Sequence, residues 1–159
     1  MENTTYTALY DSRDKEILKI AEDSLDPKLD RVNEIVAYCK EAGITNLGIA
    51  NCTAFNREAS SLELFLQQNG FTVSKVNCKL GRVPFNELVP DYKGVSCNPA
   101  GQAKYLEDAG TELNIMMGLC LGHDMIFNSK SAAPVTPLIV KDRKHKHHSL
   151  KTFETIQEN

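Results

Sequence analysis

The sequence predicts an α/β fold, a three-layer sandwich of Rossmann-like or flavodoxin-like type built on a mostly parallel sheet of about four strands. Short apolar runs typical of buried strands alternate with segments that have helical periodicity, and glycines separate several of them. Such alternation favours a parallel sheet with right-handed crossovers and helices on both faces. The expected strands are residues 47–50, 71–77, 115–117 and 137–141.

Helices are expected where apolar residues recur at three- and four-residue spacing. Gly43 and Gly70 are natural helix stops, while Asn98 and Pro99 form a typical cap and first helical position. The segment 79–96 has no clear periodicity and is expected to be a long loop, which is often a functional feature. The expected helices are residues 12–25, 28–42, 56–69, 97–108 and 123–127, with a weak terminal helix in 149–159.

Length and composition fit one soluble domain, residues 1–159, with N-terminal helices at about 12–42, a core at about 45–143 and a tail at 144–159. The chain has 159 residues, of which 42% are hydrophobic and 25% charged, and its net charge is -3. A negative charge argues against a general nucleic-acid or anionic-membrane partner. No apolar run reaches the roughly 20 residues of a membrane helix, and no secretory signal is visible. We therefore expect a cytoplasmic protein; its oligomeric state is not predicted.

Four cysteines are expected at one edge of the sheet. Cys52 follows the first strand, Cys78 the second and Cys120 the third, while Cys97 precedes the helix that leads to the third strand. Parallel strands bring their carboxyl ends to the same side, where open α/β sheets bind ligands. In a reducing compartment such cysteines are better interpreted as thiols or ligands than as disulfides. The four are expected to hold a [4Fe–4S] cluster or, alternatively, Zn²⁺.

Other roles for the cysteines remain open at this stage. Their spacing contains no Cys-x-x-Cys, so each could simply be a small buried hydrophobe. Cys39 lies on the apolar face of the expected helix 28–42 and is interpreted as core. Cys97 and Cys120 each lie near a helix start, where a thiolate is stabilised, and either could be a nucleophile.

Three further side chains are candidate catalytic residues. His123 and Asp124 follow Cys120 and could act as a ligand and its orienting carboxylate, or as an acid–base pair; helix-start and surface roles are the alternative. Asp142 and Arg143 follow the fourth strand and could point into the site as an anion or substrate anchor. The histidines in 145–148 are more typical of a solvated loop than of a metal site.

Five blocks of the chain resemble a small cysteine-rich family, domain of unknown function 1847. They are residues 47–52, 78–81, 97–103, 114–124 and 133–143, and the similarity covers about residues 28–150. Members of this family are often labelled metal-binding proteins, and their occurrence in anaerobes would suit an oxygen-sensitive cluster. Many carry extra N-terminal cysteines, whereas this chain has none before Cys39.

The expected function is therefore metal binding through four thiolates, for redox, sensing or small-substrate chemistry. If one thiol does not coordinate, an iron with an open coordination position could act on a small molecule held near Arg143. The alternative is a metal-free redox or sulfur-transfer enzyme that uses Cys97 or Cys120 as nucleophile and His123 as base. Whether the protein is an enzyme is left open, and no dinucleotide or P-loop motif is present.

Overall fold

The computed structural model describes residues 5–156 and divides the chain into two compact units, Met1–Ile44 and Thr45–Asn159. The division falls between the N-terminal helices and the core that the sequence predicts. None of the helices in the described range is long and apolar enough to cross a membrane.

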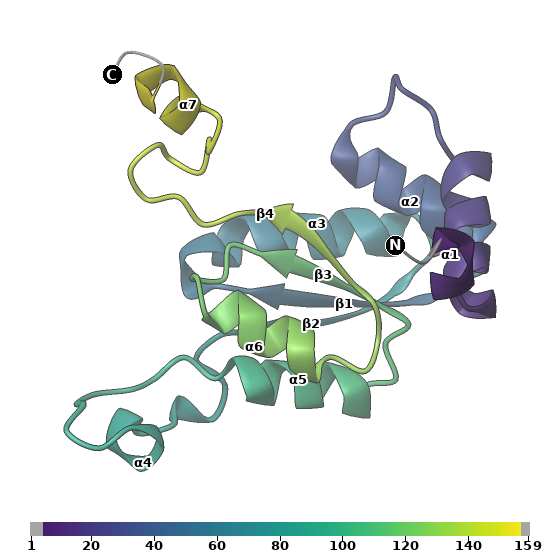
Figure 1. The fold of residues 1–159 in the computed structure, drawn as a ribbon. Helices are drawn as coiled ribbons and strands as arrows, with labels where there is room; N and C mark the ends of the chain where they lie inside the picture. The colour runs from purple at the N-terminus through teal and green to yellow at the C-terminus, as the bar shows by residue number, and fades with distance from the viewer. Residues whose placement is uncertain (1–4, 157–159) are drawn as a thin grey trace. The chain divides into compact units, whose positions relative to one another are not determined.

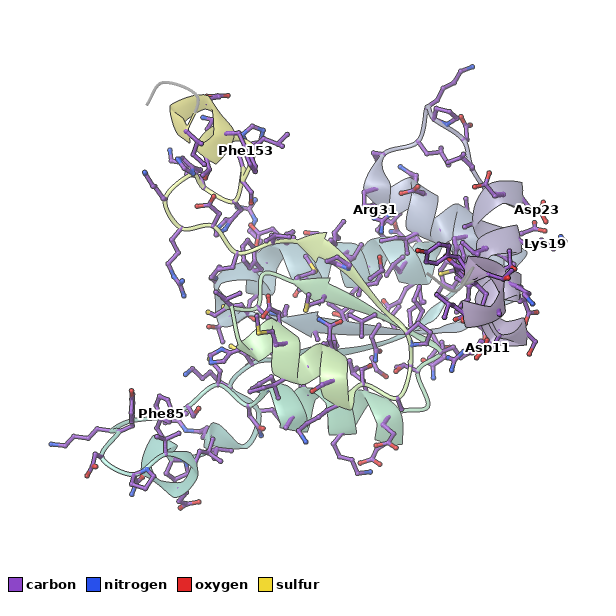
Figure 2. All side chains as sticks on the ribbon, in the orientation of Figure 1. Asp11, Lys19, Asp23, Arg31, Phe85 and Phe153 are labelled. Atoms are coloured by element: carbon purple, nitrogen blue, oxygen red, sulfur yellow. The ribbon has the colours of Figure 1, made fainter. Side chains whose placement is uncertain are left out.

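The first unit contains the 3-10 helix η1 (Tyr6–Leu9) and the helices α1 (Ser12–Asp23) and α2 (Arg31–Glu41). Asp11 caps α1 in a reciprocal capping box with Asp14, so the cap lies one residue before the predicted Ser12. Lys19 and Asp23 pair along its outer face (Figure 2). Helix α2 begins three residues later than predicted, because the Asp30 carboxylate accepts from the Val32 and Asn33 amides.

The second unit is built on a four-stranded, all-parallel sheet in the order β2-β1-β3-β4, which confirms the predicted fold class. Strands β1 and β3 are almost completely buried, as central strands of a doubly covered sheet must be. The strands are β1 (Asn46–Asn51), β2 (Thr72–Asn77), β3 (Leu113–Met117) and β4 (Val135–Ile139).

Helices cover both faces of this sheet, as Figure 1 shows: α3 packs on one face, and α5 and α6 pack side by side on the other. The predicted cap of α5 is confirmed, since Asn98 Oδ1 accepts from the Gly101 amide and Pro99 is the first helical residue. The remaining elements of this unit are η2 (Thr53–Phe55), α3 (Asn56–Gln68), η3 (Leu80–Arg82), α4 (Phe85–Leu88), α5 (Pro99–Asp108), α6 (His123–Lys130) and α7 (Lys151–Ile156).

The fourth strand differs from its prediction, since it begins at Val135 rather than Pro137 and ends at Ile139 rather than Lys141. Pro137 lies inside the strand, which is tolerated because β4 is an edge strand and the missing N–H is needed by no outer neighbour. The β3–β4 register shifts just after Pro137. Residues 140–143 are consequently released from the sheet and can turn toward its carboxyl edge.

The segment 79–96, predicted to be a loop, contains the short helices η3 and α4 and forms an excursion between β2 and α5. Hydrogen bonds across its base close it: the Ser96 amide donates to Val83 O, and Lys79 Nζ donates to Val95 O. At its tip the Phe85 ring lies 4.7 Å from that of Tyr92, centroid to centroid (Figure 2). The two ends of the excursion, and the cysteines that flank it, are thereby held together.

Candidate functional site

The carboxyl ends of β1, β2 and β3 are tied together by backbone hydrogen bonds that continue the sheet into its loops. The Cys52 amide donates to Met117 O, and the Cys78 amide donates to Asn51 O. The chain leaves β1 toward β2 in one direction and passes from β3 toward β4 in the other, so β1 and β3 flank the topological switch point. In sheets of this kind, ligands bind in the crevice at that point.

Cys78 and Cys97 lie in direct contact, with 3.6 Å between the two Sγ atoms. The approach is set by the backbone, because the Asn98 amide donates to Cys78 O at 2.8 Å. Cys78 is 2% exposed, whereas Cys97 is half-buried. The pair therefore has one thiol facing the interior and one facing solvent.

Cys52 adjoins this pair in the same hydrophobic cluster, which also contains Phe55. Burial raises the pKa of the Cys52 thiol, but hydrogen bonds from the Ala54 amide and from Lys141 outweigh burial, and the net pKa is lowered. Lys141 Nζ lies 3.3 Å from Cys52 Sγ and 4.8 Å from the centroid of the Phe55 ring. Cys52 is thus the thiol of this cluster whose charged form is favoured by a cation.

Cys78 behaves in the opposite way. Burial raises its pKa to about 11, and the nearby Cys97 and Cys52 add to the rise, against a hydrogen bond from the Thr53 amide. It is therefore a neutral thiol at pH 7. A metal bound here would have to displace this proton.

Cys120 lies on the loop after β3, where its carbonyl accepts from the amides of His123 and Asp124 at the start of α6. Its Sγ accepts from Arg143 Nη2 at 3.0 Å. Cys120 lies outside the buried cluster that holds the other three thiols. The structure therefore places the Arg143 guanidinium in direct contact with the Cys120 sulfur.

Asp124 Oδ1 accepts from the Met125 amide at the start of α6, which is the helix-start role that the sequence offers as the alternative to a pairing with His123. A carboxylate–histidine pair does form in the tail segment, where Asp142 Oδ2 lies 3.2 Å from His145 Nδ1. The His145 amide and the His145 ring lower the pKa of Asp142. Asp142 therefore orders residues 142–147, and its role as a substrate anchor stays a prediction.

Cys39 is fully buried on α2 with Ile35 and Val36, which confirms its interpretation as a core residue. It belongs to the first compact unit, whereas the other four cysteines belong to the second.

Two contributors to the edge were not identified from the sequence. Lys141 was noted only as the end of a strand, although it reaches Cys52. Gln102 is completely buried on α5, where its Nε2 donates to Asn51 O and Val76 O, and its Oε1 has no hydrogen-bond partner among the described residues. The signal for Gln102 is a polar residue on the otherwise apolar buried face of α5, and its partners depend on tertiary structure.

The thiol arrangement fits a metal in part. Within residues 5–156 no three His, Cys, Asp or Glu side chains are assembled closely enough to hold an ion as they stand. Two sulfurs, those of Cys78 and Cys97, already lie at ligand spacing, and Cys52 adjoins them. Soft thiolates are the donor type that iron–sulfur clusters and zinc prefer.

Fold and edge together define an α/β protein in which thiols are grouped at the carboxyl edge of a parallel sheet. The chain belongs to the protein family of unknown function DUF1847, whose model matches residues 2–138. It is 37% identical over 156 residues to an uncharacterised protein of Methanocaldococcus jannaschii, with 91% of this chain and 80% of that protein covered. No solved structure matches the chain significantly.

Proposed function

We propose that the protein binds a soft metal centre, an iron–sulfur cluster or a zinc ion, through the thiolates of Cys52, Cys78, Cys97 and Cys120. The observation that supports this most is the grouping of three thiols from distant parts of the chain, with Cys78 Sγ and Cys97 Sγ 3.6 Å apart. Burying several sulfurs together at the ligand-binding edge of a sheet is what a thiolate site requires.

The distance between Cys78 Sγ and Cys97 Sγ bears on which metal centre is bound. Two thiolates on one tetrahedral ion, each with a metal–sulfur bond of about 2.3 Å, lie roughly 3.8 Å apart. The observed 3.6 Å is close to this value. A [4Fe–4S] cluster binds its cysteines on different irons and so needs them farther apart, which would require Cys97 to move outward with the base of the excursion.

Two cationic side chains fit such a centre. Lys141 and Arg143 each donate to a sulfur, of Cys52 and of Cys120 respectively. Four thiolates around a divalent ion or a cluster carry excess negative charge, and hydrogen bonds to ligand sulfurs stabilise and tune it. The cations come from the single segment after β4, so one loop can compensate the charge of the whole site.

The number of sulfur ligands determines what the centre does. With all four bound, the site is closed and serves electron transfer, sensing or stability. Cys120 lies apart from the other three, so a three-thiolate centre with an open position is the second arrangement. In that case Arg143 is placed to hold an anionic substrate, and His123 or Asp124 would supply proton transfer.

A second candidate function is metal-free thiol chemistry, and the contact between Arg143 Nη2 and Cys120 Sγ favours it. Cys120 is half-buried rather than sealed in the core. A guanidinium beside a thiol stabilises the nucleophilic thiolate. In this function Cys120, or alternatively Cys97, attacks the substrate and His123 acts as base.

Anaerobic purification followed by iron, sulfide and zinc analysis tests the proposal. Brown protein with absorbance bleached by dithionite supports the cluster, and colourless protein with one zinc per chain supports the single ion. Colourless, metal-free protein that cannot be loaded with either contradicts metal binding. Cys78→Ala and Cys120→Ala are expected to lose the metal, whereas the matched core variant Cys39→Ala is expected to retain it; equal retention by all three contradicts the ligand assignment.

A further inference from the structure

We propose that Cys78 and Cys97 form a reversible intramolecular disulfide in the metal-free protein, with Cys97 as the thiol that meets the oxidant. Their Sγ atoms are 3.6 Å apart, and both are thiols in this structure. The inference does not depend on metal binding, because it concerns the chain with the site empty.

Hydrogen bonds at the base of the excursion hold Cys78 and Cys97 close together before any disulfide forms. The Asn98 amide donates to Cys78 O, and Asn98 Nδ2 donates to Leu80 O, so the start of α5 is fastened to the end of β2. Lys79 Nζ adds a third connection, to Val95 O. Closing the disulfide therefore needs only a small approach of side chains that are already neighbours.

The difference in exposure assigns the two roles. Cys97 is half-buried and can be reached, whereas Cys78 is 2% exposed and cannot. With glutathione disulfide as oxidant, Cys97 thiolate attacks one of its sulfurs, forms a mixed disulfide and releases glutathione thiolate. Cys78 then attacks the Cys97 sulfur, passes its proton to the second departing glutathione, and leaves a protein disulfide and two glutathione thiols.

Cys52 and Cys120 are predicted to take no part in this bond. Cys52 Sγ adjoins Cys78 but is hydrogen-bonded to Lys141, and Cys120 Sγ is hydrogen-bonded to Arg143. Serine at either position keeps the contact with its cation and leaves the Cys78–Cys97 pair intact, so Cys52→Ser and Cys120→Ser are matched controls.

The experiment treats the full-length, metal-free protein with glutathione disulfide, traps remaining thiols with iodoacetamide and maps the products by mass spectrometry. Before alkylation, the oxidised wild type and both controls are expected to be lighter by about 2 Da, the two thiol hydrogens, and after trapping they are expected to yield a Cys78–Cys97 cross-linked peptide. Cys78→Ser is expected to stop at the mixed disulfide, with one glutathione on residue 97. Cys97→Ser is expected to form no adduct at Cys78.

Several outcomes would overturn the inference. A disulfide that maps to any other pair does so, as does a wild type that stops at a glutathione adduct. If Cys78 in the Cys97→Ser variant is labelled by glutathione as much as Cys97 in the Cys78→Ser variant, the assigned order of attack is contradicted. Circular dichroism spectra of all variants establish that each is folded. Metal analysis is a separate readout, so loss of metal binding with an intact disulfide, or the reverse, identifies which of the two proposals has failed.

Discussion

Lys141 Nζ lies 3.3 Å from Cys52 Sγ, across 89 residues of sequence. The ammonium group also stacks over the Phe55 ring, which keeps its aliphatic chain against the buried cluster. This contact joins the segment after β4 to the end of β1, and it is the only described interaction in which a lysine of that segment reaches a thiol.

Replacing Lys141 with methionine is expected to raise the pKa of Cys52, because burial then acts on the thiolate without the compensating cation. Alkylation of Cys52 at pH 7 in the metal-free protein should fall roughly tenfold, a change that corresponds to about 1.4 kcal/mol. The pH dependence of iodoacetamide labelling measures this. Lys141→Arg should retain most of the rate, and Lys144→Met is the control; no change in Lys141→Met would refute the charge argument.

Gly118 is expected to tolerate no larger residue. It has a φ of +62°, and a Cβ there would lie 2.0 Å from Phe55 Cε2. Gly118→Ala should lower the free energy of unfolding by about 1–3 kcal/mol from the backbone strain, plus the cost of displacing the ring. Urea unfolding of Gly118→Ala, Phe55→Leu and the double variant separates the backbone strain from the clash with the Phe55 ring. The double variant relieves the clash but keeps the strain. If the changes in unfolding free energy of the two single variants add up to that of the double variant, the clash is contradicted.

Gln102 is expected to hold the carboxyl ends of β1 and β2 together. Its Nε2 donates to Asn51 O at 3.2 Å and to Val76 O at 2.9 Å from a fully buried position. Gln102→Leu removes both donors and should cost about 1–3 kcal/mol of unfolding free energy, measured by urea denaturation. Gln67→Leu on the exposed face of α3 is the matched control, and it should change the unfolding free energy by about 0.5 kcal/mol or less.

Glu112 is expected to make stability depend on pH in the acid range. Hydrogen bonds from the Thr45 and Asn46 amides lower the pKa of its carboxyl group from 4.5. Because the folded-state pKa is below the unfolded value, the stabilisation is fully present above about pH 4.5 and is lost as pH falls through the folded pKa. Wild-type melting temperature should therefore exceed that of Glu112→Gln at pH 6–7, with the gap closing towards pH 3. A pH-independent gap, or one equally large for Glu87→Gln, would contradict this mechanism.

Local patterns were sufficient to predict the fold class and the α5 cap. The Asn98-Pro99 start of α5 could be recognised because capping depends on neighbours in sequence. The position of Cys52 and Cys78 at one edge followed from the ends of parallel strands alone. Apolar runs such as 115–117 identified the buried strands, although strand ends were displaced by up to two residues.

Contacts between distant segments could not be predicted in the same way. The Arg143–Cys120 and Lys141–Cys52 contacts depend on where β4 ends, and that end moved two residues because a proline was accommodated inside an edge strand. Asp124 accepts a backbone amide in the first turn of α6, which is the helix-start role given as the alternative, and the catalytic roles of His123 and Asp124 stay predictions. The metal site stays a prediction.

The excursion 79–96 begins and ends at the Cys78–Cys97 contact. A shared ion or a covalent link at that contact would turn the whole excursion into a ring sealed at its neck. Movements of α4 and of the Phe85–Tyr92 tip, or an insertion there, would then not be transmitted to the sulfurs. The Cys78–Cys97 contact itself would respond to what binds at the carboxyl edge of the sheet.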